Sequence, residues 1–271
     1  MPGISSALAL LVPVAFAAQP ATDMNLTRAV WQGREAGSPN LPESGFGLWF
    51  HVMPAHANGV RTLALLASAR VPGRYAEIYG GRLAGAVQVV AISADSGEVY
   101  HATADPPGAV PLADVMNADP GPSPKGVAKA VDAEVWFNVD LPAHLDLPRA
   151  GAYDVFLWLD ELTSQAIRAA AGKSAAGPIP SGGAIDLRLG ADRQLHGTAT
   201  AQVLTGARHL TILALDFRSR RFGVRTLTPH TNRFEIDPNR LLAGSGKVYF
   251  LAAIGTALSK VVTVETAGGP K

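Results

Sequence analysis

The sequence contains no cysteine among its 271 residues. That absence excludes disulfides, thiolate zinc sites, iron–sulfur clusters, thiol nucleophiles and a lipidated cysteine anchor. Charge is also scarce, because 17% of the residues are charged and 23 Lys and Arg stand against 22 Asp and Glu. A net charge of +1 provides little positive potential to bind a phosphate backbone, so we do not expect a nucleic-acid-binding protein.

Long apolar runs are missing as well, and no membrane span is predicted. The apolar run at 4–18 is too short to cross a bilayer, but it has the length of a signal-peptide core and ends with small residues at Ala15 and Ala17. We therefore predict a signal peptide at 1–18 and a periplasmic or secreted bacterial protein. The alternative for this run is a strand or short helix of the mature fold.

The residues that are abundant favour a folded β-protein. Hydrophobic residues make up 48% of the chain, which is enough to bury a core, and 28 Gly with 20 Pro favour turns between short strands. Apolar residues alternate with period two, for example at Leu48, Phe50 and Val52. A helix is the alternative only at 161–171, and there we prefer a strand.

Four segments recur in the same order along the chain. They pair 59–70 with 197–208, 90–99 with 213–222, 137–140 with 234–237, and 151–167 with 247–264. This internal repeat predicts domain one at 45–169 and domain two at 184–266, joined by a linker at 170–183 whose composition favours a loose joint. Domain one carries an additional Pro- and Gly-rich insertion at 105–130.

The repeated segments resemble strands E and F of immunoglobulin-like, and more closely fibronectin-like, domains. The resemblance rests on the strand at 137–140, a following Leu and the Gly-x-Tyr that ends at Tyr153, and it recurs up to Tyr249. It implies two tandem immunoglobulin-like β-sandwich domains, and a tyrosine hydroxyl that bonds to backbone upstream. Val155 and Leu251 stand where antibody domains carry a cysteine. The resemblance concerns the fold and implies no activity.

Linear catalytic motifs are missing. The sequence has no His-Glu-x-x-His, no Ser-x-x-Lys and no Gly-x-Ser-x-Gly. This weighs against an enzyme and predicts no cofactor. A hydrolytic enzyme whose active site assembles from distant residues stays an alternative.

The best metal candidate is the group His51, Met53 and His56. His51 and Met53 share one face of a strand, and a thioether beside imidazoles suits copper. A periplasmic copper-binding protein is therefore an alternative function. The competing interpretation is an ordinary outward strand face that runs into a turn.

Oxygen ligands for calcium could come from a second cluster, Asn138, Asp140, His144 and Asp146. Asp140 is matched by Asp237 in the second copy. A residue present in both copies is more simply a carboxylate that caps a loop.

Two features point to partner binding. Arg218, Arg220 and Arg221 lie at a predicted hairpin tip, where they could meet an acidic protein or glycan or could simply be solvated. Trp158 is predicted on the strand face opposite Tyr153, so another part of the protein covers it or a partner contacts it.

We predict Trp49, Trp158, Arg218, Arg220 and Arg221 as partner-binding residues. The predicted function is a non-catalytic exported binding or assembly module. It recognises a protein partner or a glycan through domain one, and domain two acts as a spacer.

Overall fold

The structure is a computed structural model. It describes residues 47–57, 60–72, 75, 78, 85–104, 133–148, 150–171, 184–204, 208–228, 231–242 and 246–266. Strands dominate these residues and the helices are short, so the predicted all-β class is confirmed. The predicted signal peptide at 1–18, the insertion at 105–130 and most of the linker at 170–183 lie outside the described residues.

The first unit contains the strands from β1 to β8. Its elements are β1 (Gly47–Ala57), β2 (Val60–Val71), β3 (Gln88–Ser93), β4 (Val99–Thr103), β5 (Ala133–Asp140), α4 (Leu141–Leu145), β6 (Gly151–Leu159), β7 (Leu162–Thr163) and β8 (Ile167–Ala171). One sheet has the order β1-β2-β5, and the other has the order β4-β3-β6-β7 with β8 also paired to β6. The segment 161–171 therefore forms strands, as preferred from the sequence.

The second unit contains the strands from β9 to β16. Its elements are β9 (Ile185–Leu189), β10 (Leu195–Ala199), α5 (Ala201–Leu204), β11 (Leu210–Asp216), β12 (Arg221–Leu227), β13 (Arg233–Ile236), α6 (Pro238–Leu241), β14 (Gly246–Ile254), β15 (Ala257–Leu258) and β16 (Val262–Thr266). Its sheets have the orders β13-β10-β9 and β12-β11-β14-β15, with β16 also paired to β14. Each unit is thus an immunoglobulin-like, fibronectin-like β-sandwich.

The last strand of each sandwich is interrupted at a buried serine. The Ser164 hydroxyl accepts a hydrogen bond from the Leu157 amide at 2.8 Å and donates to the carbonyl of the next residue. The Ser259 hydroxyl does the same with the Ala252 amide at 3.0 Å. These bonds satisfy backbone groups where the strand leaves the ladder, so the break costs little.

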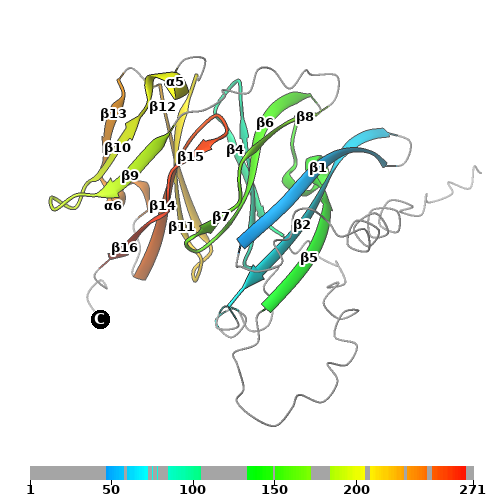
Figure 1. Ribbon diagram of the computed structural model, residues 1–271, viewed down its shortest axis with the longest axis horizontal. Coiled ribbons are helices and arrows are strands. Elements are labelled where there is room, and N and C mark those ends of the chain that lie inside the picture. Colours follow the sequence, from blue (N-terminus) through cyan, green and yellow to red (C-terminus); the bar gives the residue numbers. More distant parts are fainter. Residues whose placement is uncertain are drawn as a thin grey trace, which may run out of the picture.

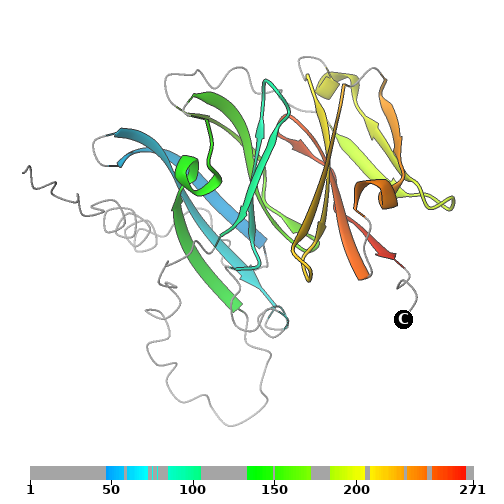
Figure 2. The same ribbon diagram turned by 180° about the vertical axis from the view of Figure 1, so that it is seen from behind.

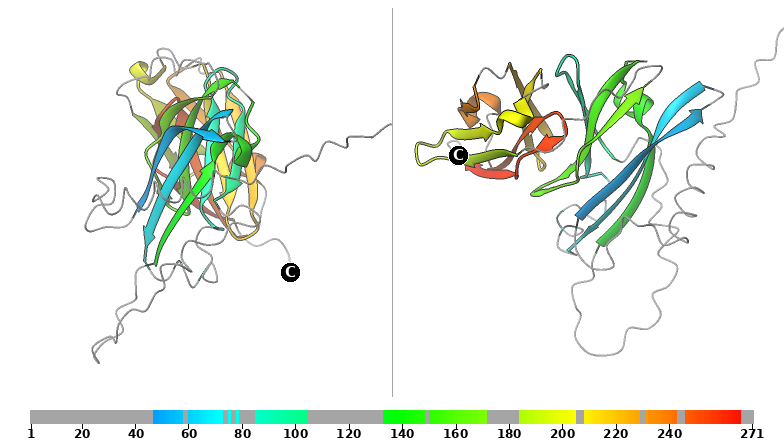
Figure 3. Two further views of the ribbon diagram at one scale, coloured as in Figure 1. Left: turned by 90° about the vertical axis from the view of Figure 1, so that its right-hand side faces the viewer. Right: turned by 45° about the horizontal axis from the view of Figure 1, so that its top comes forward.

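The two sandwiches pack face to face (Figures 1 and 2). The five-stranded sheets lie in the middle, and the sheets β1-β2-β5 and β13-β10-β9 lie on the outside. The tilted view in Figure 3 shows the same succession of layers.

The apolar core runs through the junction between the units. Ile212 and Phe250 point into the core of the second unit, whereas Leu213, Leu215 and Leu251 belong to a core continuous with the first unit. β11 and β14 are therefore buried on both faces. The described units share an apolar junction where the linker composition alone suggests a loose joint.

The sequence repeat matches the strands only in part. The segments 90–99 and 213–222 both fall on hairpins between the first two strands of a five-stranded sheet. The segments 59–70 and 197–208 both fall on the middle strand of a three-stranded sheet, but the first lies almost wholly within β2, whereas the second contains only the end of β10 and then the helix α5. A duplication as the origin of the two units stays a prediction.

Tyr153 and Tyr249 do not occupy corresponding positions. Leu157 and Ala252 correspond to each other, because the amide of each donates a hydrogen bond to a buried serine. The residue four positions before Leu157 is Tyr153, and the residue four positions before Ala252 is Val248, so Tyr153 corresponds to Val248. The predicted match is therefore wrong by one residue, and this shift turns Tyr249 to the opposite face of its sheet, toward the junction.

The expected corner bond of Tyr153 is also not formed in the described part of the chain. The ring is 2% exposed and meets Tyr100 edge-on, with centroids 6.0 Å apart. Its hydroxyl lies over Gly151, where a Cβ atom would approach it to 2.7 Å.

Candidate binding pocket

Aromatic rings fill the junction between the two units. The Trp158 indole meets Phe217 edge-on with centroids 5.8 Å apart, and Phe217 meets Tyr249 edge-on at 5.4 Å. Trp158 also contacts Phe222 at 6.3 Å, and the Phe222 ring stacks on His101 at 3.8 Å. Edge-on pairs of this kind add about 0.5–1.5 kcal/mol each beyond the area they bury.

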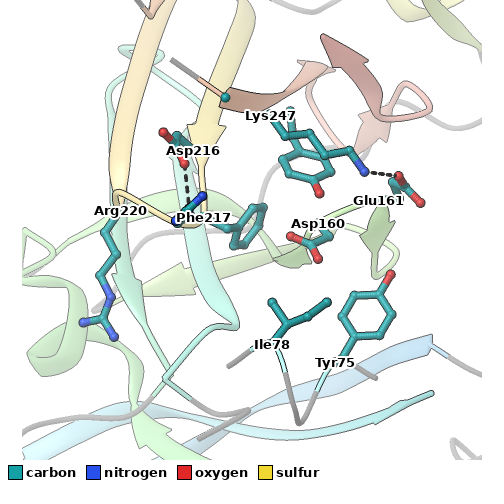
Figure 4. A pocket seen from close by; sticks show the side chains of 11 residues that line it. Tyr75, Ile78, Asp160, Glu161, Asp216, Phe217, Arg220 and Lys247 are labelled. Carbon is teal, nitrogen blue, oxygen red and sulfur yellow. Dashed lines mark hydrogen bonds and ion pairs between the residues drawn. The ribbon is translucent and has the colours of Figure 1, made fainter. Parts of the chain in front are cut away.

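A pocket with a volume of ≈ 860 Å³ opens at one end of this aromatic junction (Figure 4). Both units line it, through the β2–β3 connection, the β6–β7 turn, the β11–β12 hairpin and the start of β14. The lining residues are Tyr75 and Ile78, Asp160 and Glu161, Asp216, Phe217, Arg218 and Arg220, and Gly246, Lys247 and Tyr249. The volume lies within the range of small-ligand sites, about 300–1,000 Å³.

The first unit supplies a tightly held turn. Asp160 has a left-handed backbone with φ 49°, and its carbonyl accepts a hydrogen bond from the Trp158 indole at 2.8 Å. The neighbouring Glu161 carboxylate receives a hydrogen bond from Lys247 at 3.0 Å, so this ion pair links the two units at the rim. Trp158 thereby positions the pocket wall although it does not line the pocket.

The second unit supplies a hairpin locked by its own carboxylate. Asp216 accepts hydrogen bonds from the Arg218 and Ser219 amides at 3.0 Å and from the Ser219 hydroxyl at 2.6 Å. These bonds fix the four-residue loop between β11 and β12. The exposed Arg218 and Arg220 side chains are consequently held at the pocket by a rigid turn.

Arg220 and Asp160 carry side chains in the left-handed backbone conformation that glycine favours, and Asp tolerates this conformation better than Arg does. Arg220 has φ 56° and is the fourth residue of its hairpin loop, and the fourth residue of the β3–β4 loop is Gly97, with φ 71°. Asp160 likewise stands in a two-residue loop whose counterpart between β14 and β15 begins with Gly255, φ 57°. A left-handed backbone at a non-glycine residue costs on the order of 1–3 kcal/mol. Of the four described non-glycine residues with positive φ, Asp160 and Arg220 line the pocket, whereas Asp146 and Arg193 do not.

The charges in the pocket are unevenly compensated. Burial would raise the pKa of Asp216, but the hydrogen bonds from Ser219 and Arg218 outweigh it and hold that pKa below its usual value. The hydrogen bond to Glu161 raises the pKa of Lys247. By contrast, Arg218 and Arg220 form no ion pair with any described residue. The rim therefore has cationic groups available to an anionic ligand.

The hydroxyl of Tyr249, one of the two tyrosines that line the pocket, stays neutral at physiological pH. Burial and the nearby Asp160 carboxylate raise the pKa of Tyr249 to about 12. The Lys247 ammonium lies 5.1 Å from the centre of the Tyr249 ring. Tyr249 can therefore donate a hydrogen bond but is not set up as a nucleophile.

The opposite end of the junction is closed by contacts between the units. His209 Nε2 donates a hydrogen bond to the Asp95 carbonyl at 2.7 Å, and the Thr226 hydroxyl donates to the Gly97 carbonyl at 3.1 Å. Arg208 adds an exposed ion pair with Asp95 at 3.5 Å. The two units therefore contact each other at this end of the junction as well as at the Lys247–Glu161 ion pair beside the pocket.

The structure places the predicted partner-binding residues in different surroundings. Arg218, Arg220 and Arg221 are exposed, and the first two line the pocket. Trp158 is 0% exposed, so it contacts the second unit rather than an external partner. Trp49 is half-buried on β1, away from the pocket.

Sequence reasoning missed the pocket residues Tyr75, Asp160 and Lys247, which come from three distant segments. The one local signal was the Asp160-Glu161 turn, because an Asp preceded by a long apolar strand often adopts a left-handed turn conformation. Nothing in the sequence indicated that this turn faces a hairpin of the other unit.

The structure leaves the predicted copper ligands untested. His51, Met53 and His56 lie on β1, where they are in register with Leu66, Ala64 and Arg61 of β2. The side chains of the three candidate ligands lie outside the described structure. The copper site stays a prediction.

The predicted calcium cluster is used for other contacts. The Asp140 carboxylate accepts a hydrogen bond from the Thr62 hydroxyl at 2.6 Å, and His144 donates to the Thr103 carbonyl at 2.8 Å. Within the described ranges, no group of three or more His, Asp and Glu side chains could hold a metal ion. Asp237, the match of Asp140, caps α6 by accepting from the Asn239 amide.

No protein-family model matches the chain, and no curated protein matches it. Among solved structures, it is similar to the BSP domain of a biofilm-associated protein, with 13% identity over 76% of this chain and a TM-score of 0.20. The chain spans 28% of the length of that structure. It is also similar to a segment of two fibronectin type III domains from chicken tenascin, with 11% identity, 82% of this chain and 100% of that chain covered, and a TM-score of 0.20. Likeness at this TM-score carries no function over to the chain.

None of the helices in the described part of the chain has the length and apolar character of a membrane-crossing segment.

Proposed function

We propose that the chain is an exported, non-catalytic binding module that recognises a protein partner or a glycan at the junction pocket. The observation that carries this proposal is the left-handed backbone of Asp160 and Arg220, both of which line the pocket. Backbone strain persists where the surrounding structure enforces it, and it concentrates at binding and catalytic sites. Retaining Arg220 where the corresponding loop of the first unit has Gly97 is explained if the arginine side chain contacts a ligand.

The chemistry of the pocket supports binding rather than turnover. The described lining residues include no Ser, Thr, Cys or His that could act as a nucleophile or a base beside a carboxylate. Asp216 is committed to its own turn and Glu161 to Lys247. These commitments leave the arginines as the groups most available to a ligand.

The position of the pocket implies that both units take part in recognition. The predicted interface was in domain one alone, with domain two as a spacer. Because the lining comes from four segments of two sandwiches, a bound ligand would contact both of them. Binding of a ligand should therefore stabilise the packing of the two units against each other.

Two surface arrays test this proposal with one pair of variants. The full chain is applied to a peptide array and to a glycan array, together with Arg220→Gly and the control Arg193→Gly. Arg193 is also left-handed, with φ 62°, but it lies in the β9–β10 turn and does not line the pocket. We expect a reproducible set of bound spots that Arg220→Gly loses and Arg193→Gly keeps. Binding that both variants retain, or no binding to either array, would refute the pocket as the recognition site.

A further inference from the structure

The strand β12 forms an edge of the junction sheet. Its residues pair with β11 on one side, and no described strand pairs with its other side. Val224 in the middle of β12 is an exposed apolar side chain, 43% accessible. An edge strand with free backbone groups is a template for an added strand.

The charge along this edge is entirely positive. The segment from Phe217 to Leu227 contains Arg218, Arg220, Arg221 and Arg225 and no acidic residue. The four arginines are exposed. None of them forms an ion pair with a described residue.

The edge begins at the pocket. β12 starts at Arg221, directly after Arg220, whose left-handed backbone ends the hairpin loop. A chain laid along β12 would therefore reach the pocket rim without a gap. Its backbone would bond to the edge while its side chains met the arginines.

We infer that the ligand of the junction pocket is an extended, acidic polypeptide segment that adds to β12 as a further strand and places acidic side chains on Arg218, Arg220 and Arg225. This inference rests on the proposed function, because it names the ligand class of the same pocket. Guanidinium groups bind carboxylates with two parallel hydrogen bonds, which suits this side-chain chemistry.

Two other occupants fit the edge less well. A second copy of the chain paired antiparallel through β12 would bring Arg221 and Arg225 of both copies together, and like charges across a ladder are destabilising. A glycan would need exposed ring faces for stacking, but Tyr75, Phe217 and Tyr249 are 6%, 8% and 6% exposed. The arginines thus oppose self-association while they attract an acidic strand.

Fluorescence anisotropy with defined peptides tests the inference on the full chain. The probe is a labelled hexapeptide, Glu-Val-Glu-Thr-Glu-Val, and it is compared with the same peptide carrying Lys for Glu. A third peptide keeps the acidic sequence but has alternate backbone amides methylated, which removes its ladder hydrogen bonds. We expect the acidic peptide to bind at least about tenfold more tightly than either of the other two.

The protein variants are Arg225→Glu and the control Arg188→Glu, an exposed arginine on β9 of an outer sheet. Arg225→Glu should lower the affinity for the acidic peptide by about tenfold, and Arg188→Glu should leave this affinity unchanged. Circular dichroism confirms that each variant is folded, and the methylated peptide tests the strand addition without altering the protein.

The outcomes separate this inference from the proposed function. If the methylated peptide binds as well as the parent, strand addition is refuted while an anion-binding pocket stands. If array ligands lost by Arg220→Gly are glycans and the acidic peptide does not bind, the ligand class is refuted and the pocket stands. If sedimentation shows a dimer that Arg225→Glu alters, β12 binds a second copy and the inference is wrong.

Discussion

The Trp158 indole of the first unit meets the Phe217 ring of the second edge-on, with centroids 5.8 Å apart and planes at 89°. The same indole donates a hydrogen bond to the Asp160 carbonyl at the pocket. One side chain therefore joins the packing of the two sandwiches to the geometry of the candidate site. Because its contacts cross the junction, we expect the two units to unfold together.

Trp158→Ala should lower the free energy of unfolding by about 3–5 kcal/mol, since it opens a large cavity in a core with few voids. Urea denaturation followed by far-ultraviolet circular dichroism measures the loss. Trp49→Ala is the matched control, because Trp49 is only half-buried on an outer sheet. A loss at Trp158 no larger than at Trp49, or two separate transitions in the unmodified protein, would contradict a shared cooperative core.

A second prediction concerns the buried ion pair on the junction sheet of the first unit. Arg168 donates two hydrogen bonds to Asp154, at 2.8 and 2.7 Å, and their side chains are 11% and 4% exposed. Asp154→Ala should cost about 3–5 kcal/mol, because the guanidinium would stay buried without its carboxylate. The double variant Asp154→Leu with Arg168→Met should recover most of this loss in the same denaturation experiment. If the double variant is less stable than Asp154→Ala, the cost does not come from an uncompensated charge.

The strands could be predicted from the sequence, but the faces of β14 could not. Val248 to Ile254 are all buried, so the strand has no polar side to mark its register. A shift of one residue exchanges the two faces of a strand, and here both faces are apolar. The sequence repeat therefore matches Tyr249 to Tyr153, although Tyr249 faces the junction and lines the pocket.

The pocket could not be predicted because its residues are brought together only by the packing of the two units. Arg218 and Arg220 were found as a charge cluster, since local sequence shows charge density. Asp160 and Lys247 have no local feature that relates them to that cluster. The linker composition also gave no indication that the sandwiches would bury a face against each other, because that burial depends on residues such as Trp158 and Phe217.

Acid should destabilise the junction through His101. His101 is an exposed residue, but its ring stacks on Phe222, and this partial desolvation lowers the pKa of His101 in the folded protein from 6.5. The unfolded chain therefore takes up a proton at higher pH than the folded chain does, so stability is present above pH about 6.5 and decreases as the pH falls below it. Burial also lowers the pKa of His144, partly opposed by the Thr103 carbonyl, so the two histidines act in the same direction.

Urea denaturation between pH 7.5 and 5 tests this dependence. His101→Phe keeps an aromatic ring on Phe222 but removes the titrating group, so its stability should decrease less steeply toward pH 5. An identical slope for the variant and the unmodified protein would show that His101 does not contribute. Carboxylates titrate mainly below about pH 5, so a change in the free energy of unfolding between pH 7.5 and 5 reports mainly on histidines.

The last prediction sets stability against binding at Arg220. Arg220 adopts φ 56°, a conformation that glycine adopts without a Cβ penalty and that Gly97 adopts at the same place in the β3–β4 loop. Arg220→Gly should relieve strain on the order of 1 kcal/mol but lose part of that gain to the greater chain entropy of glycine, so we expect a melting temperature equal to or slightly above that of the unmodified protein. Arg193→Gly, at φ 62° in the β9–β10 turn and not among the pocket-lining residues, should change stability in the same way. Only Arg220→Gly should abolish the binding of the acidic hexapeptide. If Arg220→Gly instead unfolds the hairpin or lowers the melting temperature well below that of Arg193→Gly, the arginine stabilises its loop, and the strain argument for a binding site fails.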